Sequence, residues 1–166
     1  MDRQETHRSF VSYIDRSREY YAAQGYAKPY AWARHDDVPF TRLKKPLAAC
    51  RIALVTTAAR TQRTDMIGPP VMLRELYAQP ADPPPERLYT DGLFWDKAAT
   101  DTDDVDSFLP LTRLAEAAAA GRIGSASPRF YGVPTDYSQA RTRERAPQIL
   151  AWCRADAVDA VVLAGL

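Results

Sequence analysis

The chain has 166 residues, of which 46% are hydrophobic and 26% charged, a balance typical of a globular domain with a core of its own. This composition excludes disorder, collagen and coiled coil as descriptions of the whole chain. The 22 basic and 21 acidic side chains leave a formal net charge of +1, too small to attract nucleic-acid phosphates or anionic lipids, so we expect neither nucleic acid nor a membrane as partner.

The patterns of apolar residues, cysteines and glycines exclude further classes of protein. No apolar run approaches the roughly 20 residues that span a bilayer, and the N-terminus lacks the apolar core of a secretory signal, so we expect a cytoplasmic protein. Cys50 and Cys153 lie outside any CxxC spacing, which predicts buried thiols rather than a disulfide framework or a zinc site. The seven glycines form neither a dinucleotide-binding nor a Walker pattern. We therefore expect no metal and no cofactor held by this chain alone.

The N-terminal part predicts a helix followed by an ordered arm. Apolar residues recur at helical spacing over residues 6–24, and Gly25 follows where a left-handed cap would end a helix. Residues 26–46 combine three prolines with several aromatic side chains, which forbids a long helix yet is too apolar for a free linker. We expect this arm to pack on the core through the aromatic side chains of Tyr30, Trp32 and Phe40.

The middle of the chain contains one clear element and two weaker ones. Residues 52–57 are continuously apolar and β-branched, which predicts a strand buried on both faces of a parallel sheet. Residues 71–77 are expected to form one or two helical turns. Residues 88–95 predict a hairpin around the turn dipeptide Asp91-Gly92.

The C-terminal part predicts two helices and a strand. Residues 110–120 begin with proline, contain an alanine run and precede Gly121, which predicts a helix with an inner stripe formed by Leu111, Leu114, Ala115 and Ala118. A second helix is expected over residues 137–156, kinked or split by Pro147, with a buried side formed by Ile149, Leu150, Trp152 and Cys153. Residues 158–166 predict another buried strand of the parallel type.

Strands that alternate with helices indicate an α/β fold, with an open, mainly parallel sheet and flanking helices. We expect residues 1–46 to form the helix and arm and residues 47–166 to form the α/β domain. An apolar last strand without a polar tail predicts a polypeptide that is incomplete at its C-terminus, with a terminal edge strand as the alternative. An uncovered strand edge also favours self-association into a homo-oligomer.

Few residues carry recognisable chemistry. His35, Asp36 and Asp37 place a histidine beside two carboxylates, although a capping or solvated cluster that holds the arm is the alternative. Thr56 and Thr57 follow the predicted strand where ligands of open α/β sheets bind, with simple termination of the strand as the alternative. The acidic run 101–106 lacks the glycine and the glutamate of a calcium loop.

Three blocks of sequence point to a family: the arm at residues 30–40 with the segment 45–58 that follows it, the segment 109–124, and the segment 155–163. On these blocks the chain resembles the N-terminal portion of the selenoprotein B family of glycine, sarcosine and betaine reductases, to which D-proline reductase is related. The resemblance runs through most of the chain in consistent order, and none of the blocks is a catalytic signature.

The resemblance implies a specific chemistry. In that family a selenocysteine or cysteine, followed by a further cysteine, comes just after the strand that looks like residues 158–163, so the nucleophile would lie directly beyond Leu166. A selenol or thiol of low pKa suits this role because the anion is the nucleophile. A partner subunit would hold the amine of the substrate on its pyruvoyl group, and a selenoprotein A-like protein or a thiol would act as reductant. The codon after Leu166 would then be UGA.

Two classes of function therefore compete. The first is a component of a reductase that cleaves the C–N bond of glycine, sarcosine, betaine or a related amine. The second is a binding or assembly domain that keeps the fold without the redox motif. A racemase-like or other α/β enzyme that uses Thr56 and Asp36 is a weaker third interpretation.

Overall fold

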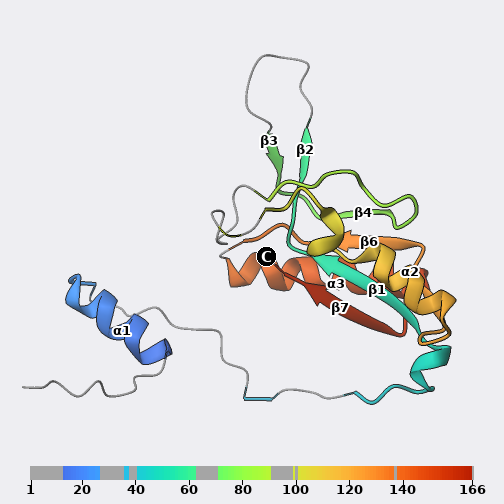
Figure 1. Ribbon diagram of the computed structural model, residues 1–166. Helices are drawn as coiled ribbons and strands as arrows, with labels where there is room; N and C mark the ends of the chain where they lie inside the picture. Colours follow the sequence, from blue (N-terminus) through green and yellow to red (C-terminus); the bar gives the residue numbers. More distant parts are fainter. Residues whose placement is uncertain are drawn as a thin grey trace, which may run out of the picture. The chain divides into compact units, whose positions relative to one another are not determined.

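The computed structural model of the protein describes residues 13–26, 36–37, 41–62, 71–90, 99, 101–136 and 138–165 (Figure 1). Contacts within the chain define two units, Met1–Thr41 and Arg42–Leu166. In the first unit, α1 spans Tyr13–Ala23 and Gly25 follows with a φ of +85°, which confirms the described part of the predicted helix and its cap. Of the aromatic residues of the predicted arm, Tyr26 is exposed, and Tyr30, Trp32 and Phe40 lie outside the described residues.

The second unit is built on a five-stranded sheet with β1 (Arg51–Thr56) at its centre. One side of β1 pairs in parallel with β5 (Ser125–Ala126) at its start and with β6 (Arg129–Gly132) at its end. The other side pairs in parallel with β7 (Ala160–Ala164), as Figure 1 shows. Among the described strands of this sheet, β4 (Tyr77–Pro80) alone is antiparallel, beside β6. The predicted α/β class with an open, mainly parallel sheet is confirmed.

Helices cover both faces of this sheet. One face is covered by the 3-10 helix η2 (Val105–Ser107) and by α2 (Leu111–Ala119), and the other face by α3 (Gln139–Ala155). Successive side chains of β1 point to opposite faces and so contribute to two different cores. The core on the η2 and α2 side includes Leu54, Phe108, Leu109, Leu111 and Phe130, and the core on the α3 side includes Ala53, Val55, Tyr131 and Cys153. Burial from both sides explains the unbroken apolar run that predicted this strand.

Helix α2 confirms the predicted element and corrects its inner stripe. Pro110 precedes the helix, the carboxylate of Asp106 accepts a hydrogen bond from the backbone N–H of Thr112, and Gly121 has a φ of +68°. Ala115, predicted to face the core, is exposed, and Ala117 packs on the core instead. Leu111, Leu114 and Ala117, spaced three residues apart, contact the core. Ala115 lies outside this stripe.

Helix α3 is not split at Pro147, contrary to one form of the prediction. Pro147 lies on the exposed side of the helix, so the backbone carbonyl that loses its partner faces solvent. Ser138 caps the start by accepting a hydrogen bond from the backbone N–H of Arg141 at 3.3 Å. Ile149, Trp152 and Cys153 pack on the sheet as expected, whereas Leu150 is half exposed.

Two expectations for the middle of the chain have different outcomes. Residues 71–77 do not form helical turns, because β3 (Val71–Leu73) pairs antiparallel with β2 (Arg60–Gln62) and Tyr77 starts β4. Long-range pairing overrides the weak local preference of this segment. The predicted turn at Asp91-Gly92 lies outside the described residues, and Tyr89 forms a bridge with Ala59.

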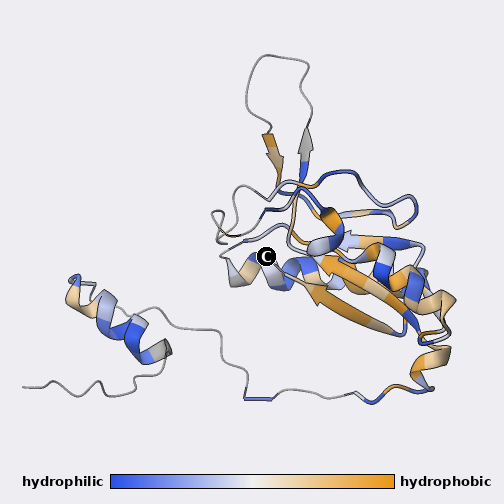
Figure 2. Ribbon diagram, in the orientation of Figure 1, coloured by the Kyte–Doolittle hydropathy of each residue, from blue (hydrophilic) through white to orange (hydrophobic). Residues whose placement is uncertain are grey.

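The last strand is parallel, as predicted, but it is not buried. β7 lies at an edge of the sheet, and Val162 and Leu163 are 50% and 78% exposed. Figure 2 shows β7 coloured as hydrophobic along its length, like β1 in the centre. Within the described part of the chain, no helix is long and apolar enough to cross a membrane.

Candidate functional site

The carboxyl ends of β1 and β6 lie side by side, because Thr56 pairs with Gly132. After β1 the chain forms β2, β3, β4 and η2 before α2 covers one face of the sheet, whereas after β6 it leads directly to α3 on the other face. In open α/β sheets, such diverging connections leave room for a ligand between the two strand ends. The residues that surround this point are therefore the candidate site.

Thr56 and Thr57 lie at this point, as their place in the sequence predicted. Thr56 has no exposed surface, and its Oγ1 accepts a hydrogen bond of 3.2 Å from the backbone N–H of Ala58. Its carbonyl accepts from the N–H of Val133, which joins the two strand ends at 2.8 Å. Thr56 therefore shapes the end of the strand, whereas Thr57 is only partly buried and stays the candidate for ligand contact.

A buried tyrosine of the core lies beside the end of β6. The Tyr77 hydroxyl donates a hydrogen bond of 2.8 Å to the carbonyl of Ala58, and its ring lies against Gly132 of the neighbouring strand. The guanidinium carbon of Arg60 lies 5.0 Å from the centre of this ring. Burial raises the pKa of Tyr77, although Arg60 acts in the opposite direction, so the phenol stays protonated and holds the loop after β1.

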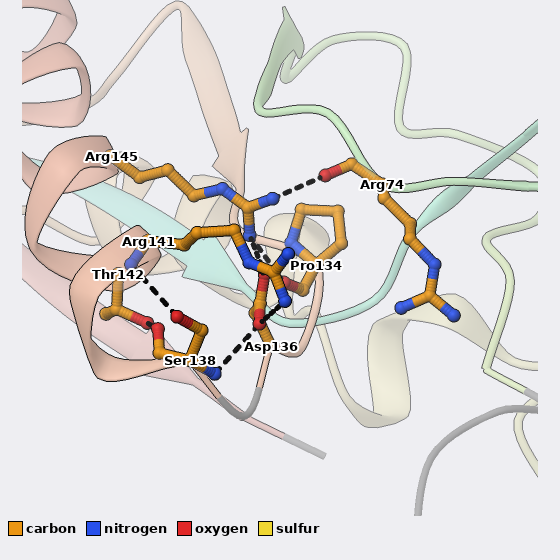
Figure 3. A network of polar contacts seen from close by, with 7 residues as sticks. All are labelled: Arg74, Pro134, Asp136, Ser138, Arg141, Thr142 and Arg145. Carbon is orange, nitrogen blue, oxygen red and sulfur yellow. Dashed lines mark hydrogen bonds and ion pairs between the residues drawn. The ribbon is translucent and has the colours of Figure 1, made fainter.

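The loop after β6 contains a carboxylate held by two arginines (Figure 3). Asp136 accepts hydrogen bonds from the backbone N–H of Ser138 and from Arg141, both at 2.9 Å, and its Oδ2 lies 3.3 Å from Nη1 of Arg145. The hydrogen bond from Ser138, the hydrogen bond from Arg141 and the charge of both arginines lower the pKa of Asp136. This carboxylate is therefore ionised at neutral pH and orients both guanidinium groups.

Arg145 joins three segments near the carboxyl end of β6. Its guanidinium donates to the carbonyl of Pro134 at 3.4 Å and to the carbonyl of Arg74 at 3.1 Å, in addition to its ion pair with Asp136. Figure 3 shows the side chain of Arg74 turned away from these contacts. Arg145 is mostly buried, whereas the Arg141 side chain is 62% exposed. Arg145 thus fixes the loops, and Arg141 presents a charge to solvent.

Two polar atoms at the same edge have no partner among the described residues. They are Oγ1 of Thr135, in the loop after β6, and Nε of Arg60, just after β1. A buried polar atom without a hydrogen bond costs free energy unless water or a ligand satisfies it. Both atoms are therefore consistent with a polar occupant in this region.

The other predicted site residues belong to the first unit of the chain or lie outside the described residues. Asp36 and Asp37 are exposed residues of the first unit, and His35 lies outside the described residues. In the acidic run, Asp104 and Asp106 cap η2 and α2. Within the described part of the chain, no group of three or more histidine, cysteine, aspartate or glutamate side chains is arranged to hold a metal ion.

Both cysteines are free and buried, as the sequence predicted. The thiol of Cys50 lies 3.4 Å from the carbonyl of Pro46, at the start of β1. Cys153 lies in the core beneath α3, where burial raises the pKa of its thiol. A raised pKa lowers the share of thiolate, so this thiol is a poor nucleophile.

Sequence reasoning did not find the cluster of Asp136, Arg141 and Arg145. The pattern that could have indicated it is an aspartate two residues before a serine N-cap, with arginines four residues apart on the following helix turns. No family model, no curated protein and no solved structure matches this chain.

Proposed function

We propose that the residues at the carboxyl ends of β1 and β6 bind the carboxylate of a small amino acid or betaine-like amine. The observation that carries this proposal is the excess of guanidinium charge at the strand ends: Asp136 faces both Arg141 and Arg145, so the cluster keeps a net positive charge. The start of α3 adds the positive end of a helix dipole to the same place.

Arg141 has the donors that this role needs. Its contacts with Asp136 use Nε and one terminal nitrogen, so the other N–H groups of the guanidinium remain for an anion. A guanidinium that binds a carboxylate through two parallel hydrogen bonds gives orientation as well as affinity. Thr57, at the end of the neighbouring strand, adds a hydroxyl for the polar part of the same ligand.

Within this proposal the chain acts as a cytoplasmic component of a reductase of the selenoprotein B type, which cleaves the C–N bond of glycine, sarcosine, betaine or a related amine. The support is the sequence resemblance together with a binding site for the anionic end of such substrates. The pyruvoyl group belongs to a partner subunit, and a selenoprotein A-like protein or a thiol provides the electrons. The described residues contribute binding and orientation.

The binding step is tested by calorimetric titration of the whole chain with glycine, sarcosine and betaine, and with choline as a ligand that lacks the carboxylate. We expect the three carboxylates to bind and choline to fail. Arg141→Gln should weaken binding about tenfold, since a charge-assisted pair of hydrogen bonds is lost. Because Arg141 is exposed, this change should leave the fold stable.

Arg143→Gln is the matched control, because Arg143 is an exposed arginine of the same helix, two residues after Arg141. Equal loss of affinity in both variants would mean that helix charge alone attracts the anion, and equal binding of choline would exclude a carboxylate site. Either result contradicts the proposed site.

The reductase assignment needs a separate test. The tagged chain, purified from its native cells, should bring down a subunit that reacts with phenylhydrazine, because the keto carbon of a pyruvoyl group forms a hydrazone. Absence of any hydrazine-reactive partner, with carboxylate binding intact, would favour the second candidate, a binding or assembly domain without redox chemistry. The burial of Cys50 and Cys153 fits both candidates, since neither of them uses these thiols.

A further inference from the structure

The edge strand β7 exposes an apolar surface that the rest of the described chain does not cover. Within the described residues β7 pairs with β1 alone, so the hydrogen-bonding groups on its outer side have no strand beside them. Its five residues are all aliphatic, and Leu163 is 78% exposed. Natural edge strands are usually protected by charged residues, proline or a bulge, and Ala160–Ala164 contains none of these.

A groove accompanies this edge on the α3 side of the sheet. It has a volume of about 630 Å³ and lies between α3 and β7. Its apolar lining includes Val55, Ile149, Leu150, Val161 and Leu163. Leu150, half exposed on α3, faces this groove rather than the core. Strand edge and groove together form one continuous apolar surface.

The charged side chains that line the groove have opposite signs and lie at its two ends. Among the described residues that line it, Arg145 and Asp159 are the charged ones. Arg145 lies at the carboxyl ends of the strands, where it bonds to Pro134, and Asp159 lies at the amino end of β7, where its N–H donates to Arg51. Each has a partner within the chain, since Asp159 also pairs with Lys45 at 2.8 Å.

The two ends of the groove are lined by different residues, so the direction of pairing decides which ends meet. Two β7 strands placed side by side in parallel would bring like ends together, with Asp159 facing Asp159. An antiparallel pair related by a two-fold axis near Val162 brings the Arg145 end of one copy towards the Asp159 end of the other. Val161 of each copy then faces Leu163 of the other on the α3 side, where cross-strand apolar pairs stabilise a sheet.

We propose that the chain forms a two-fold symmetric homodimer in which the β7 strands of two copies pair antiparallel and continue the sheet. Pairing of two five-residue strands alone covers too little surface for a stable complex, since specific interfaces bury about 1,200 Å² or more. The groove supplies the additional apolar area, because the exposed Leu163 of each copy lies where it can cover the groove of the other.

Sedimentation velocity of the whole chain over a range of concentrations tests the dimer. We expect reversible dimerisation in the wild type and at least a tenfold weaker association for Leu163→Glu, which places a charge in the interface. Leu47→Glu is the matched control, because Leu47 is also half exposed but lies in the 3-10 helix η1 (Leu47–Ala49), away from the groove. A wild type that is monomeric throughout, or a dimer that persists in Leu163→Glu, overturns the proposal.

A thiol cross-link tests the direction of pairing. Val162→Cys places one thiol of each copy close to the two-fold axis, so a short bismaleimide should join two copies in high yield. The wild type, whose two thiols are buried, and Leu47→Cys should give little product. A dimer that forms normally but gives no cross-link through Cys at this position would exclude the antiparallel β7 pair.

Discussion

The hydroxyl of Tyr131, on β6, donates a hydrogen bond of 2.7 Å to Oδ2 of Asp156, the residue that follows α3. Arg129 of the same strand donates to both oxygens of this carboxylate, at 2.8 and 3.0 Å. The ring of Tyr131 is fully buried and stacks on Trp152 of α3, with ring centres 6.1 Å apart. These contacts fix the end of α3 to the sheet at the edge opposite to the candidate site.

Asp156→Asn should destabilise the protein by about 2 kcal/mol, because Arg129 and Tyr131 lose a charged acceptor. The effect stays below that of a fully buried ion pair, since Arg129 is about one third exposed and solvent screens the charge. Urea unfolding near pH 7 measures the difference. Glu116→Gln, which removes an exposed ion pair with Arg113, is the control and should change the free energy of unfolding by less than about 0.5 kcal/mol.

The destabilisation by Asp156→Asn should depend on pH. Burial by itself raises the pKa of Asp156, but the hydrogen bonds from Arg129 and Tyr131 outweigh it, so the pKa is lowered in the folded state. A carboxyl with a lowered folded pKa stabilises the fold above its unfolded pKa of about 3.9, and this contribution is lost as the pH falls through the folded pKa. The difference between wild type and variant should therefore shrink below about pH 4. A difference that is constant from pH 7 to pH 3 would show that the charge of Asp156 contributes nothing.

Gly132→Ala should destabilise the protein by about 2 kcal/mol or more, because a Cβ at this position would overlap the ring of Tyr77. The ring cannot move freely, since its hydroxyl donates a hydrogen bond to the carbonyl of Ala58 and the ring makes a T-shaped contact with Phe130. Gly165→Ala is the control, as a Cβ there meets nothing within 4 Å. Denaturation midpoints of the two variants test the prediction, which fails if both changes are equally tolerated.

Neither thiol should react with a disulfide reagent in the folded protein near pH 7, whereas both should react after unfolding in guanidinium chloride. Cys50 has no exposed surface, and burial raises the pKa of the Cys153 thiol, so little thiolate is available. Counting reactive thiols under both conditions measures this. Rapid labelling of Cys153 in the folded state would show that the groove beside it opens further than the structure indicates.

The purified chain should show no reductive cleavage of glycine, sarcosine, betaine or D-proline with a dithiol as electron donor. The resemblance places the nucleophile beyond Leu166, and the two thiols of the chain are buried. Cys50→Ser and Cys153→Ser should alter stability alone. Turnover that disappears in either variant would identify that thiol as the active one and would contradict the reductase interpretation proposed here.

Local sequence patterns correctly predicted those elements whose structure depends on residues close together in the sequence. The apolar run of β1 indicated burial on both faces, and the proline, alanine and glycine around α2 indicated its start and end. The spacing of Cys50 and Cys153 indicated buried thiols. In each case the chain itself carries the reason, because propensity, capping and hydrophobic periodicity act over a few residues.

The tertiary structure decided the features that depend on contacts between residues far apart in the sequence. Residues 71–77 have weak local preferences, and pairing of β3 with β2 and of β4 with β6 made them extended. Ala115 and Leu150 fit a helical stripe in the sequence, but the place where each helix crosses the sheet left both exposed. Thr57 was identified from its place after a strand, and Asp136, Arg141 and Arg145 contact one another through the local turn into α3. Only the pairing of β6 with β1 places this cluster at the end of the strand that neighbours the one before Thr57. The order of strands is fixed by contacts across the whole chain, so no local pattern could have predicted this placement of the cluster.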